Sequence, residues 1–165
     1  MKKLIALMMA LVLALSLTAC FGTNTDNSTA DEANAAPVDT YEKDFTGLLK
    51  YINDRNGSAT KSELYYDILG AENGARLVLN NNAYVEVYDF SSVAENGASA
   101  DSADPEKAQS ILAQVKENGK FTPLEDGTEM TAAVTDSGKY LLAWDATRSY
   151  DYEGKVATEE LLENW

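Results

Sequence analysis

The sequence predicts one α+β domain with a mostly antiparallel sheet of about four strands, arranged as two hairpins, and three to four packed helices. Two observations lead to this class. Apolar residues recur at helical spacing in some segments, and two other segments alternate around turn residues. A helix followed by a hairpin occurs twice, which fits either a repeated unit or a common α+β order, because the residues of the two halves do not match.

Two helices are expected in the first part of the domain. The first carries one apolar stripe and ends at Asn56-Gly57, and its stripe consists of Phe45, Leu48, Leu49 and Ile52. The second is shorter, begins after Ser62 as a possible N-cap and stops before Gly70, and its apolar residues are Leu64, Tyr65, Ile68 and Leu69.

The first hairpin is expected between residues 75 and 90. Three consecutive asparagines, Asn80 to Asn82, separate two apolar runs and tolerate the left-handed backbone angles of a tight turn. The small and polar residues 91–103 that follow predict a mobile surface loop.

The second half of the domain repeats the order of helix and hairpin. Asp104-Pro105 supplies an N-cap and a first-turn proline for a helix that closes at Gly119. Residues 129–135 and 139–145 then predict a hairpin. Thr158 caps a terminal helix with Glu159 and Glu160 in its first turn.

The start of the chain has the order of parts of a secretory signal. A basic pair at residues 2–3 precedes an apolar stretch of 14 residues, Leu4 to Leu17, and small residues then lead to Cys20, the one cysteine of the chain. The stretch is too short to span a bilayer comfortably, because a helix needs ~20 residues to cross about 30 Å of hydrocarbon.

The residues Leu17-Thr18-Ala19-Cys20 resemble the lipobox of bacterial lipoproteins. The resemblance implies cleavage between Ala19 and Cys20, lipidation of Cys20, and retention of the protein by this lipid on the extracytoplasmic face of the cell membrane. Two or three acyl chains make such attachment durable, because each buried methylene contributes ~0.8 kcal/mol. An ordinary signal peptide with a cysteine near the cut is the alternative.

If the lipobox is cleaved, the chain has three parts. They are a signal peptide (residues 1–19), a lipidated cysteine with a disordered acidic tether (residues 20–39), and one extracytoplasmic domain (residues 40–165). After cleavage, 11 basic and 27 acidic side chains remain, a formal charge of −16. Phosphate backbones repel such a surface, so nucleic-acid binding is not expected, whereas cationic peptides and basic protein faces stay possible partners. The charge also has the simpler role of keeping an exported domain soluble.

Catalysis has little support in the composition, so no catalytic residue, metal ligand or cofactor is assigned. The chain has no histidine, its cysteine is committed to lipid, and Gly70 to Gly74 lacks the Lys-Ser/Thr of a phosphate-binding loop. Paired carboxylates, for example among Asp145, Asp151 and Glu153, leave a small carboxylate-dependent envelope hydrolase as one alternative.

Calcium binding is the other alternative, because Ca²⁺ accepts sites made of oxygen ligands alone. The candidate pairs are Asp101 with Asp104 and Asp145 with Asp151. No Asp-x-Asp-x-Asp-Gly loop occurs, and each pair also fits a helix cap or a solvated loop.

Aromatic residues of the two hairpins supply the main candidate binding surface. Alternation along residues 83–90 and 139–145 separates the aliphatic Val85, Val87, Leu141 and Ala143 from an aromatic set comprising Tyr84, Tyr88, Tyr140, Leu142 and Trp144. An uncovered aromatic set would form a platform for an envelope protein, a peptide or a glycan. The alternative places these aromatics in the core against helix 105–118, with the first helix over the aliphatic side.

The order of elements and two phrases, Tyr84-Val-Glu-Val-Tyr88 and Ser137-Gly-Lys-Tyr-Leu-Leu142, are similar to small lipoproteins of Firmicutes bacteria over roughly residues 72–145. That resemblance implies no catalytic residue. Together, these observations predict a membrane-anchored extracytoplasmic lipoprotein that acts as a non-catalytic binding or accessory module at the cell envelope.

Overall fold

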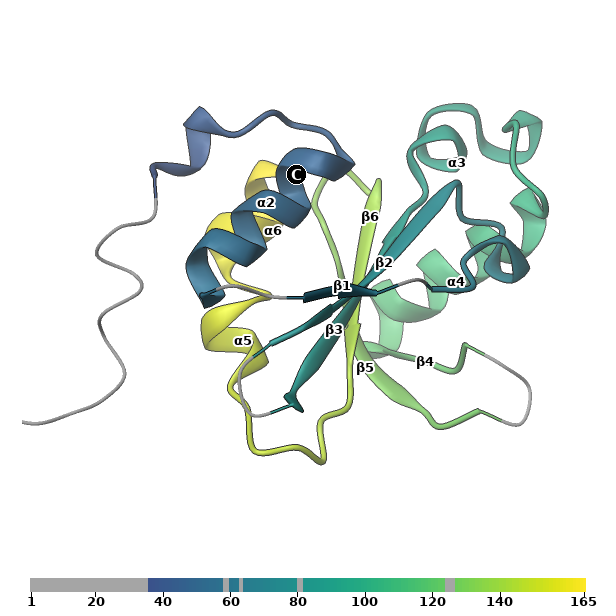
Figure 1. Ribbon diagram of the computed structural model, residues 1–165. Coiled ribbons are helices and arrows are strands. Elements are labelled where there is room, and N and C mark those ends of the chain that lie inside the picture. Colours follow the sequence, from purple (N-terminus) through teal and green to yellow (C-terminus); the bar gives the residue numbers. More distant parts are fainter. Residues whose placement is uncertain (1–35, 58–59, 63, 80–81, 124–126) are drawn as a thin grey trace, which may run out of the picture.

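The computed structural model describes residues 36–57, 60–62, 64–79, 82–123 and 127–165, and these form an α+β fold. One antiparallel sheet of six strands runs through the middle of the domain in the order β1-β2-β3-β6-β5-β4, with helices on both of its faces (Figure 1). The predicted class is therefore confirmed, whereas the expected number of about four strands was too small.

The elements have the following bounds. The strands are β1 (Thr60–Ser62), β2 (Asn73–Val78), β3 (Tyr84–Asp89), β4 (Lys120–Phe121), β5 (Met130–Val134) and β6 (Tyr140–Trp144). The helices are α2 (Phe45–Asn56), α3 (Ser91–Asn96), α4 (Pro105–Asn118), α5 (Tyr152–Lys155) and α6 (Glu159–Asn164). Short 3₁₀ turns occur at η2 (Val38–Thr40), η3 (Asp67–Leu69) and η5 (Gly97–Ser99).

Both predicted hairpins are present, and they meet in the centre of the sheet. β2 pairs with β3 and β5 pairs with β6, and β3 and β6 then pair with each other so that Tyr88 lies opposite Leu141. Asn82 takes the left-handed backbone angle expected of the first turn, with φ of 59°, and Gly138 does so in the second, with φ of 76°. The two extra strands, β1 and β4, are short and form the edges.

Side-chain caps fix the starts of the three predicted helices that the structure contains. The backbone N–H of Gly47 donates to Asp44 at the start of α2, that of Lys107 to Asp104 at the start of α4, and that of Leu161 to Thr158 at the start of α6. Such a cap contributes about 1 kcal/mol, which is sufficient to set where a short amphipathic helix begins.

The expected second helix after Ser62 was wrong. Ser62 ends strand β1, and the described residues 64–70 that follow form the 3₁₀ turn η3 and no α-helix. Among the four apolar residues of the expected stripe, Leu69 is buried, whereas Tyr65 is 85% exposed and Ile68 is 42% exposed. A stripe that does not face the core contributes little burial, so helical spacing alone does not stabilise a helix here.

The expected loop over residues 91–103 was also wrong over residues 91–99, which form α3 and η5. Asp89 accepts hydrogen bonds from the N–H and hydroxyl of Ser91, and the N–H of Ala94 donates to the carbonyl of Phe90. Val93 is buried and anchors the helix. A helix this short buries a single side chain, so its sequence shows no repeat of apolar residues from which a helix could be predicted.

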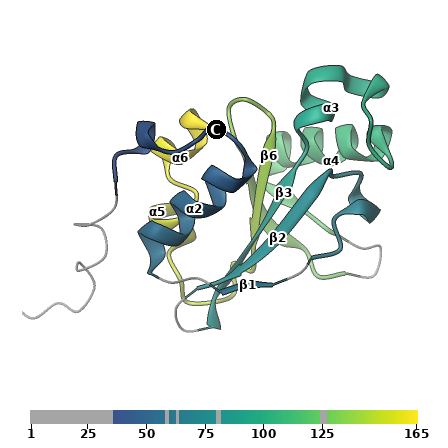
Figure 2. The same ribbon diagram turned by 45° about the horizontal axis from the view of Figure 1, so that its top comes forward.

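Helices cover the two faces of the sheet unequally. α2, α5 and α6 lie over one face, and α3 and α4 lie over the other (Figure 2). The order of helix, edge strand and hairpin does occur twice, as α2-β1-β2-β3 and α4-β4-β5-β6. The two long helices nevertheless lie on opposite faces, because the core residues of α2 and α4 belong to separate clusters.

Candidate functional site

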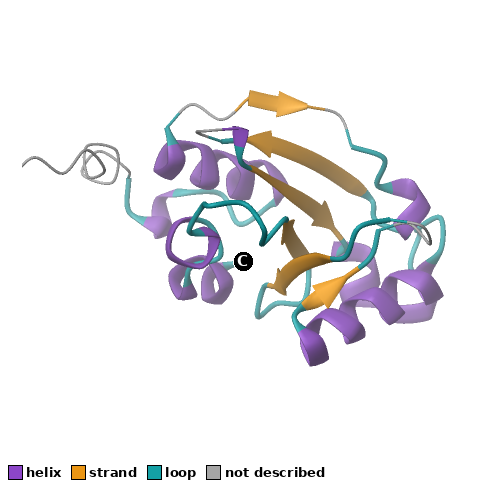
Figure 3. Ribbon diagram, turned by 90° about the horizontal axis from the view of Figure 1, so that it is seen from below, coloured by secondary structure: helices purple, strands orange, loops and turns teal. Residues whose placement is uncertain are grey.

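A groove with a volume of about 810 Å³ lies beside the β1 edge of the sheet. We call it the β1 groove, and its lining residues are Lys61, Ser62, Leu64, Tyr65, Tyr66, Asp67 and Gly74. In Figure 3, the short arrow of β1 lies at the outer margin of the sheet. The groove therefore combines a sheet edge with the segment that leaves it.

The difference in length between β1 and β2 produces this groove. β1 pairs only with Arg76 to Val78, so the first residues of β2 extend beyond the end of β1. Tyr66 covers the face of β2 at Gly74, where an added Cβ would come within 2.6 Å of the Tyr66 Cβ. Glycine is required there because the tyrosine packs directly on the backbone.

A side chain caps the backbone of β2 where this strand extends beyond β1. Backbone groups of alternate strand residues point to the same side, and the Arg76 carbonyl accepts a 3.5 Å hydrogen bond from the Ser62 hydroxyl on the β1 side. Gly74, two residues earlier, therefore also faces the edge, where its N–H donates to Asn73 Oδ1 at 2.9 Å. An exposed asparagine thus occupies a donor that strand pairing would otherwise use.

The walls of the β1 groove carry aromatic, apolar and charged groups. Tyr65, which lines the groove, and Ile68, which follows the lining residue Asp67 in the chain, are the exposed large hydrophobic side chains found among the described residues. Lys61 and Asp67 are exposed at the same groove. This mixture suits an amphipathic ligand more than a purely apolar one.

A buried ion pair lies on the adjoining face of the sheet. Glu86, 3% exposed, accepts from the guanidinium of the cross-strand residue Arg76, with Nε at 3.0 Å, and from the hydroxyl of Tyr88 at 2.6 Å. Burial, followed by the charge of Glu86, raises the pKa of Tyr88. The carboxylate is therefore neutralised by a partner that itself reaches water, since the Arg76 side chain is 41% exposed.

The structure does not bring the four residues of the expected aromatic platform together. Tyr88 belongs to the core cluster under α4, with the half-buried Tyr84 packed against that cluster, whereas Tyr140 and Trp144 belong to the cluster under α2, α5 and α6. Tyr88, Tyr140 and Trp144 are each at most 3% exposed. The platform was therefore wrong in geometry, because antiparallel pairing places Tyr88 opposite Leu141 and Tyr140 opposite Asp89.

The alternative core arrangement holds only in part. Tyr88 lies under α4 as expected, but Trp144 stacks on Tyr152 of α5 at a centroid distance of 5.5 Å. The aliphatic residues are divided in the same way. Val85 and Val87 share the cluster of Trp144, and Leu141 and Ala143 share that of Tyr88.

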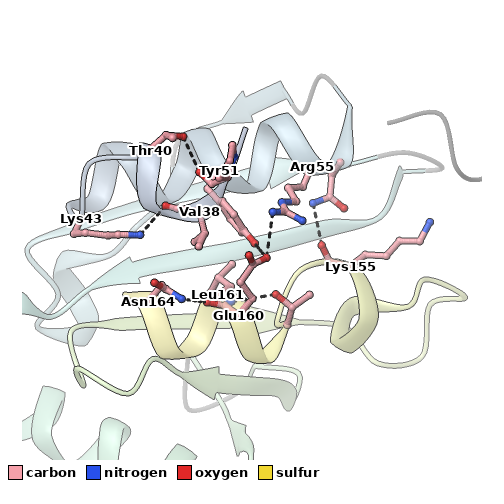
Figure 4. A network of polar contacts seen from close by, with 12 residues as sticks. Val38, Thr40, Lys43, Tyr51, Arg55, Lys155, Glu160, Leu161 and Asn164 are labelled. Atoms are coloured by element: carbon pink, nitrogen blue, oxygen red, sulfur yellow. Dashed lines mark hydrogen bonds and ion pairs between the residues drawn. The ribbon is translucent and has the colours of Figure 1, made fainter. Parts of the chain in front are cut away.

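Polar contacts close the seam between α2 and α6 (Figure 4). The Tyr51 hydroxyl donates to Glu160 Oε2 at 2.7 Å, and Arg55 reaches the same oxygen at 3.1 Å. Burial and this hydrogen bond raise the pKa of Tyr51 to about 12. The Lys43 ammonium, just before α2, lies 3.9 Å from the ring centroid of Trp165, just after α6. The two helices are therefore in contact at both ends of their interface.

A second hollow of about 350 Å³ lies at the start of α2. It includes Glu42 and Asp44, and one oxygen of Asp44 already accepts the N–H of Gly47 as the helix cap. The position of the Asp44 carboxylate in this hollow is therefore explained by its role as the N-cap of α2.

Three of the four acidic residues considered for calcium accept hydrogen bonds from nearby residues. Asp104 and Asp151 cap α4 and α5, and Asp145 accepts from the N–H and hydroxyl of Thr147. Asp101 is exposed, with its N–H donating to the Ser92 hydroxyl. Across the described ranges, no three His, Cys, Asp or Glu residues are grouped so that they could hold a metal ion.

The predicted lipidation and cleavage residues, Ala19 and Cys20, lie outside the described residues. Within the part that the structure describes, no helix is both long and apolar enough to cross a bilayer. No protein-family model, curated protein or solved structure matches the chain.

The β1 groove was not among the sites predicted from the sequence. Its signal was present in the run Leu64-Tyr65-Tyr66, where bulky residues follow one another at the sheet edge. The helical spacing of these residues with Ile68 and Leu69 suggested a buried stripe, whereas the structure exposes Tyr65 and Ile68.

Proposed function

We propose that this protein is a lipid-anchored binding module on the outer face of a cytoplasmic membrane. The observation that carries the proposal is Leu17-Thr18-Ala19-Cys20 behind an apolar stretch of 14 residues. Support for binding, as opposed to catalysis, comes from the β1 groove, whose walls offer an exposed aromatic ring, apolar surface and a sheet edge.

Anchoring changes the energetics of such a module. A lipid at Cys20 would hold the domain close to other envelope components, which raises their effective concentration without any new contact. The expected tether ends earlier than Asp39, because Val38 and Asp39 belong to η2 and Val38 packs against the core. The 17 residues from Phe21 to Pro37 would reach about 21–25 Å if flexible, and their acidic side chains are repelled by anionic headgroups. Weak binding at the groove would then suffice for stable association.

The anchor is tested by expressing the full chain in a Gram-positive host and measuring the mass of its mature N-terminus. Wild type is expected to fractionate with membranes and to begin at an acylated Cys20, and globomycin is expected to cause accumulation of the uncut form. Cys20→Ser removes the acylated sulfur and should abolish lipid attachment. Thr18→Ala is the matched control, because it gives the commoner lipobox residue and should be processed like wild type.

An unmodified amino terminus on the wild-type protein, or processing that globomycin does not affect, would contradict the lipid anchor. The ordinary signal peptide would then explain the start of the chain, and a binding role would have to stand on the groove alone.

A further inference from the structure

We infer that the β1 groove receives an extended peptide segment of a partner protein that adds a strand at the outer edge of β1 and presents alternating apolar and basic side chains. This inference deepens the proposed function, since it names the class of partner that the anchored module would bind. Strand addition is a common mode of peptide recognition, in which backbone hydrogen bonds supply affinity and side-chain pockets supply specificity.

The backbone of the edge is available for such pairing. β1 is hydrogen-bonded to β2 on one side, and among the described residues no other backbone partner contacts Thr60 to Ser62. In the antiparallel register Ser62 lies opposite Arg76, whose carbonyl faces β1, so the backbone N–H and carbonyl of the neighbouring Lys61 point away from β2. An incoming strand can pair with these two groups without breaking a hydrogen bond of the sheet, because β2 pairs with the other side of β1.

The side chains beside this edge indicate the apolar half of the pattern. Tyr65, which lines the groove, is 85% exposed, and Ile68, which follows the lining residue Asp67 in the chain, is 42% exposed. Successive residues of an added strand point to opposite faces, so every second residue would meet the tyrosine side of the groove. The segment therefore needs apolar residues at alternate positions.

Charge indicates the other half of the pattern. Residues 20–165 carry 11 basic and 27 acidic side chains, so the field of the domain attracts cations and repels anions. Within the groove, Asp67 offers an exposed carboxylate and the Tyr65 ring offers a face for a cation. A lysine or arginine in the peptide segment can pair with the Asp67 carboxylate and can also lie over the Tyr65 ring.

The opposite edge of the sheet serves as an internal comparison. β4 has only two residues, and its Lys120 pairs with Glu129 at 2.7 Å. Both edge strands are short and carry an exposed lysine, Lys61 on β1 and Lys120 on β4, so the edges differ in the groove with the exposed Tyr65 that lies beside β1. Strand addition is therefore expected at β1 and not at β4.

The test uses the full chain carrying Cys20→Ser, held in detergent micelles, so that its result does not depend on lipidation. The probe is a synthetic peptide in which valine alternates with lysine, and binding is followed by fluorescence anisotropy. Two matched peptides are compared with it. One has methyl groups on alternate backbone nitrogens, which removes donors without changing side chains, and the other has glutamate in place of lysine.

The parent peptide is expected to bind, and each matched peptide is expected to bind at least ~10-fold more weakly, a difference of about 1.4 kcal/mol. Tyr65→Ala should weaken binding of the parent peptide by a similar factor, and Tyr65→Phe should retain it because the ring remains. Lys120→Ala, at the other edge, should have no effect. Amide exchange at Lys61 should slow when the parent peptide is bound.

Three outcomes would overturn the inference. The first is no measurable binding of the parent peptide, and the second is equal binding of the backbone-methylated peptide. The third is a different occupant of the groove, shown either by concentration-dependent dimers that Tyr65→Ala disrupts or by binding of chitohexaose in place of the peptide. None of these outcomes bears on the anchor, which the mass of the mature N-terminus decides separately.

Discussion

The two faces of the sheet differ in how they are covered. On the face under α2, α5 and α6, large aromatic side chains pack on one another, as in the stack of Trp144 on Tyr152 and the tilted pair of Tyr51 and Trp165 at 4.9 Å. On the face under α3 and α4, the central strand carries the charged Glu86. The first face is therefore covered by stacked aromatic rings, whereas the second face also buries a charged group, Glu86, near the β1 groove.

The largest expected effect comes from removing an aromatic ring from the first face. Trp144→Ala should lower the free energy of unfolding by about 3–5 kcal/mol, because it deletes a fully packed side chain and leaves a cavity. Tyr84→Ala, on the second face, should cost less, since that ring is half-buried and its cation contacts with Arg76 and Arg148 are near the surface. Urea unfolding of both variants measures the difference. Equal losses would contradict the contrast between the faces.

The next effect concerns the charge on the second face. Glu86→Gln should lower the free energy of unfolding by about 1–3 kcal/mol, less than for a fully buried pair, because the Arg76 guanidinium can turn toward water. The matched control is Glu129→Gln, which breaks the exposed pair with Lys120 and should change stability by less than ~0.5 kcal/mol. If the two variants unfold at the same urea concentration, burial does not strengthen the Glu86 pair.

Several elements could be predicted from the sequence because their determinants are local. α4 has an aspartate cap at Asp104, a first-turn proline and a closing glycine within a stretch of 16 residues, and the structure places the helix at Pro105–Asn118. The hairpins have strong turn residues between alternating runs. The edge strands β1 and β4 have only three and two residues, so their formation depends on the neighbouring strand and not on their own sequence.

The face on which each aromatic lies could not be predicted in the same way. Alternation within a strand determines which of its residues share a face. The register between β3 and β6 determines which residues of the two strands lie on the same face of the sheet. Tyr88 lies opposite Leu141, so it is separated from Tyr140 and Trp144. That register joins residues about 50 positions apart, and no local pattern specifies it.

The candidate groove was missed for a related reason. Tyr65 and Ile68 have the spacing of a helical stripe, but whether a stripe is buried depends on what packs over it. In the structure, α4 covers the sheet near Leu69 and leaves the Tyr65 corner open. Exposure of an apolar residue is thus a property of the assembled fold.

A smaller effect on the first face is expected to depend on pH. Because the Tyr51 pKa rises from 10.0 to about 12 on folding, the folded state holds this proton more tightly. Its stabilising contribution is complete below pH 10 and is lost as the pH rises through about 12. Tyr51→Phe should therefore reduce the alkaline loss of stability, measured as urea midpoints at neutral and alkaline pH. Part of the loss should remain, because burial also raises the pKa of Tyr150 to about 12.

The control for this change is Tyr65→Phe, which removes a hydroxyl from an exposed ring. A pH dependence that Tyr51→Phe leaves unchanged would show that the hydrogen bond to Glu160 does not link ionisation to folding.

The smallest expected effect on stability is at the β1 groove. Tyr65→Ala should change the free energy of unfolding by less than ~0.5 kcal/mol, because a ring that is 85% exposed gains little from folding. Its expected loss of peptide binding would then be a loss of contact and not of structure. A Tyr65→Ala variant that unfolds as early as Trp144→Ala would show that the tyrosine supports the fold, and the open corner would no longer differ from the packed face.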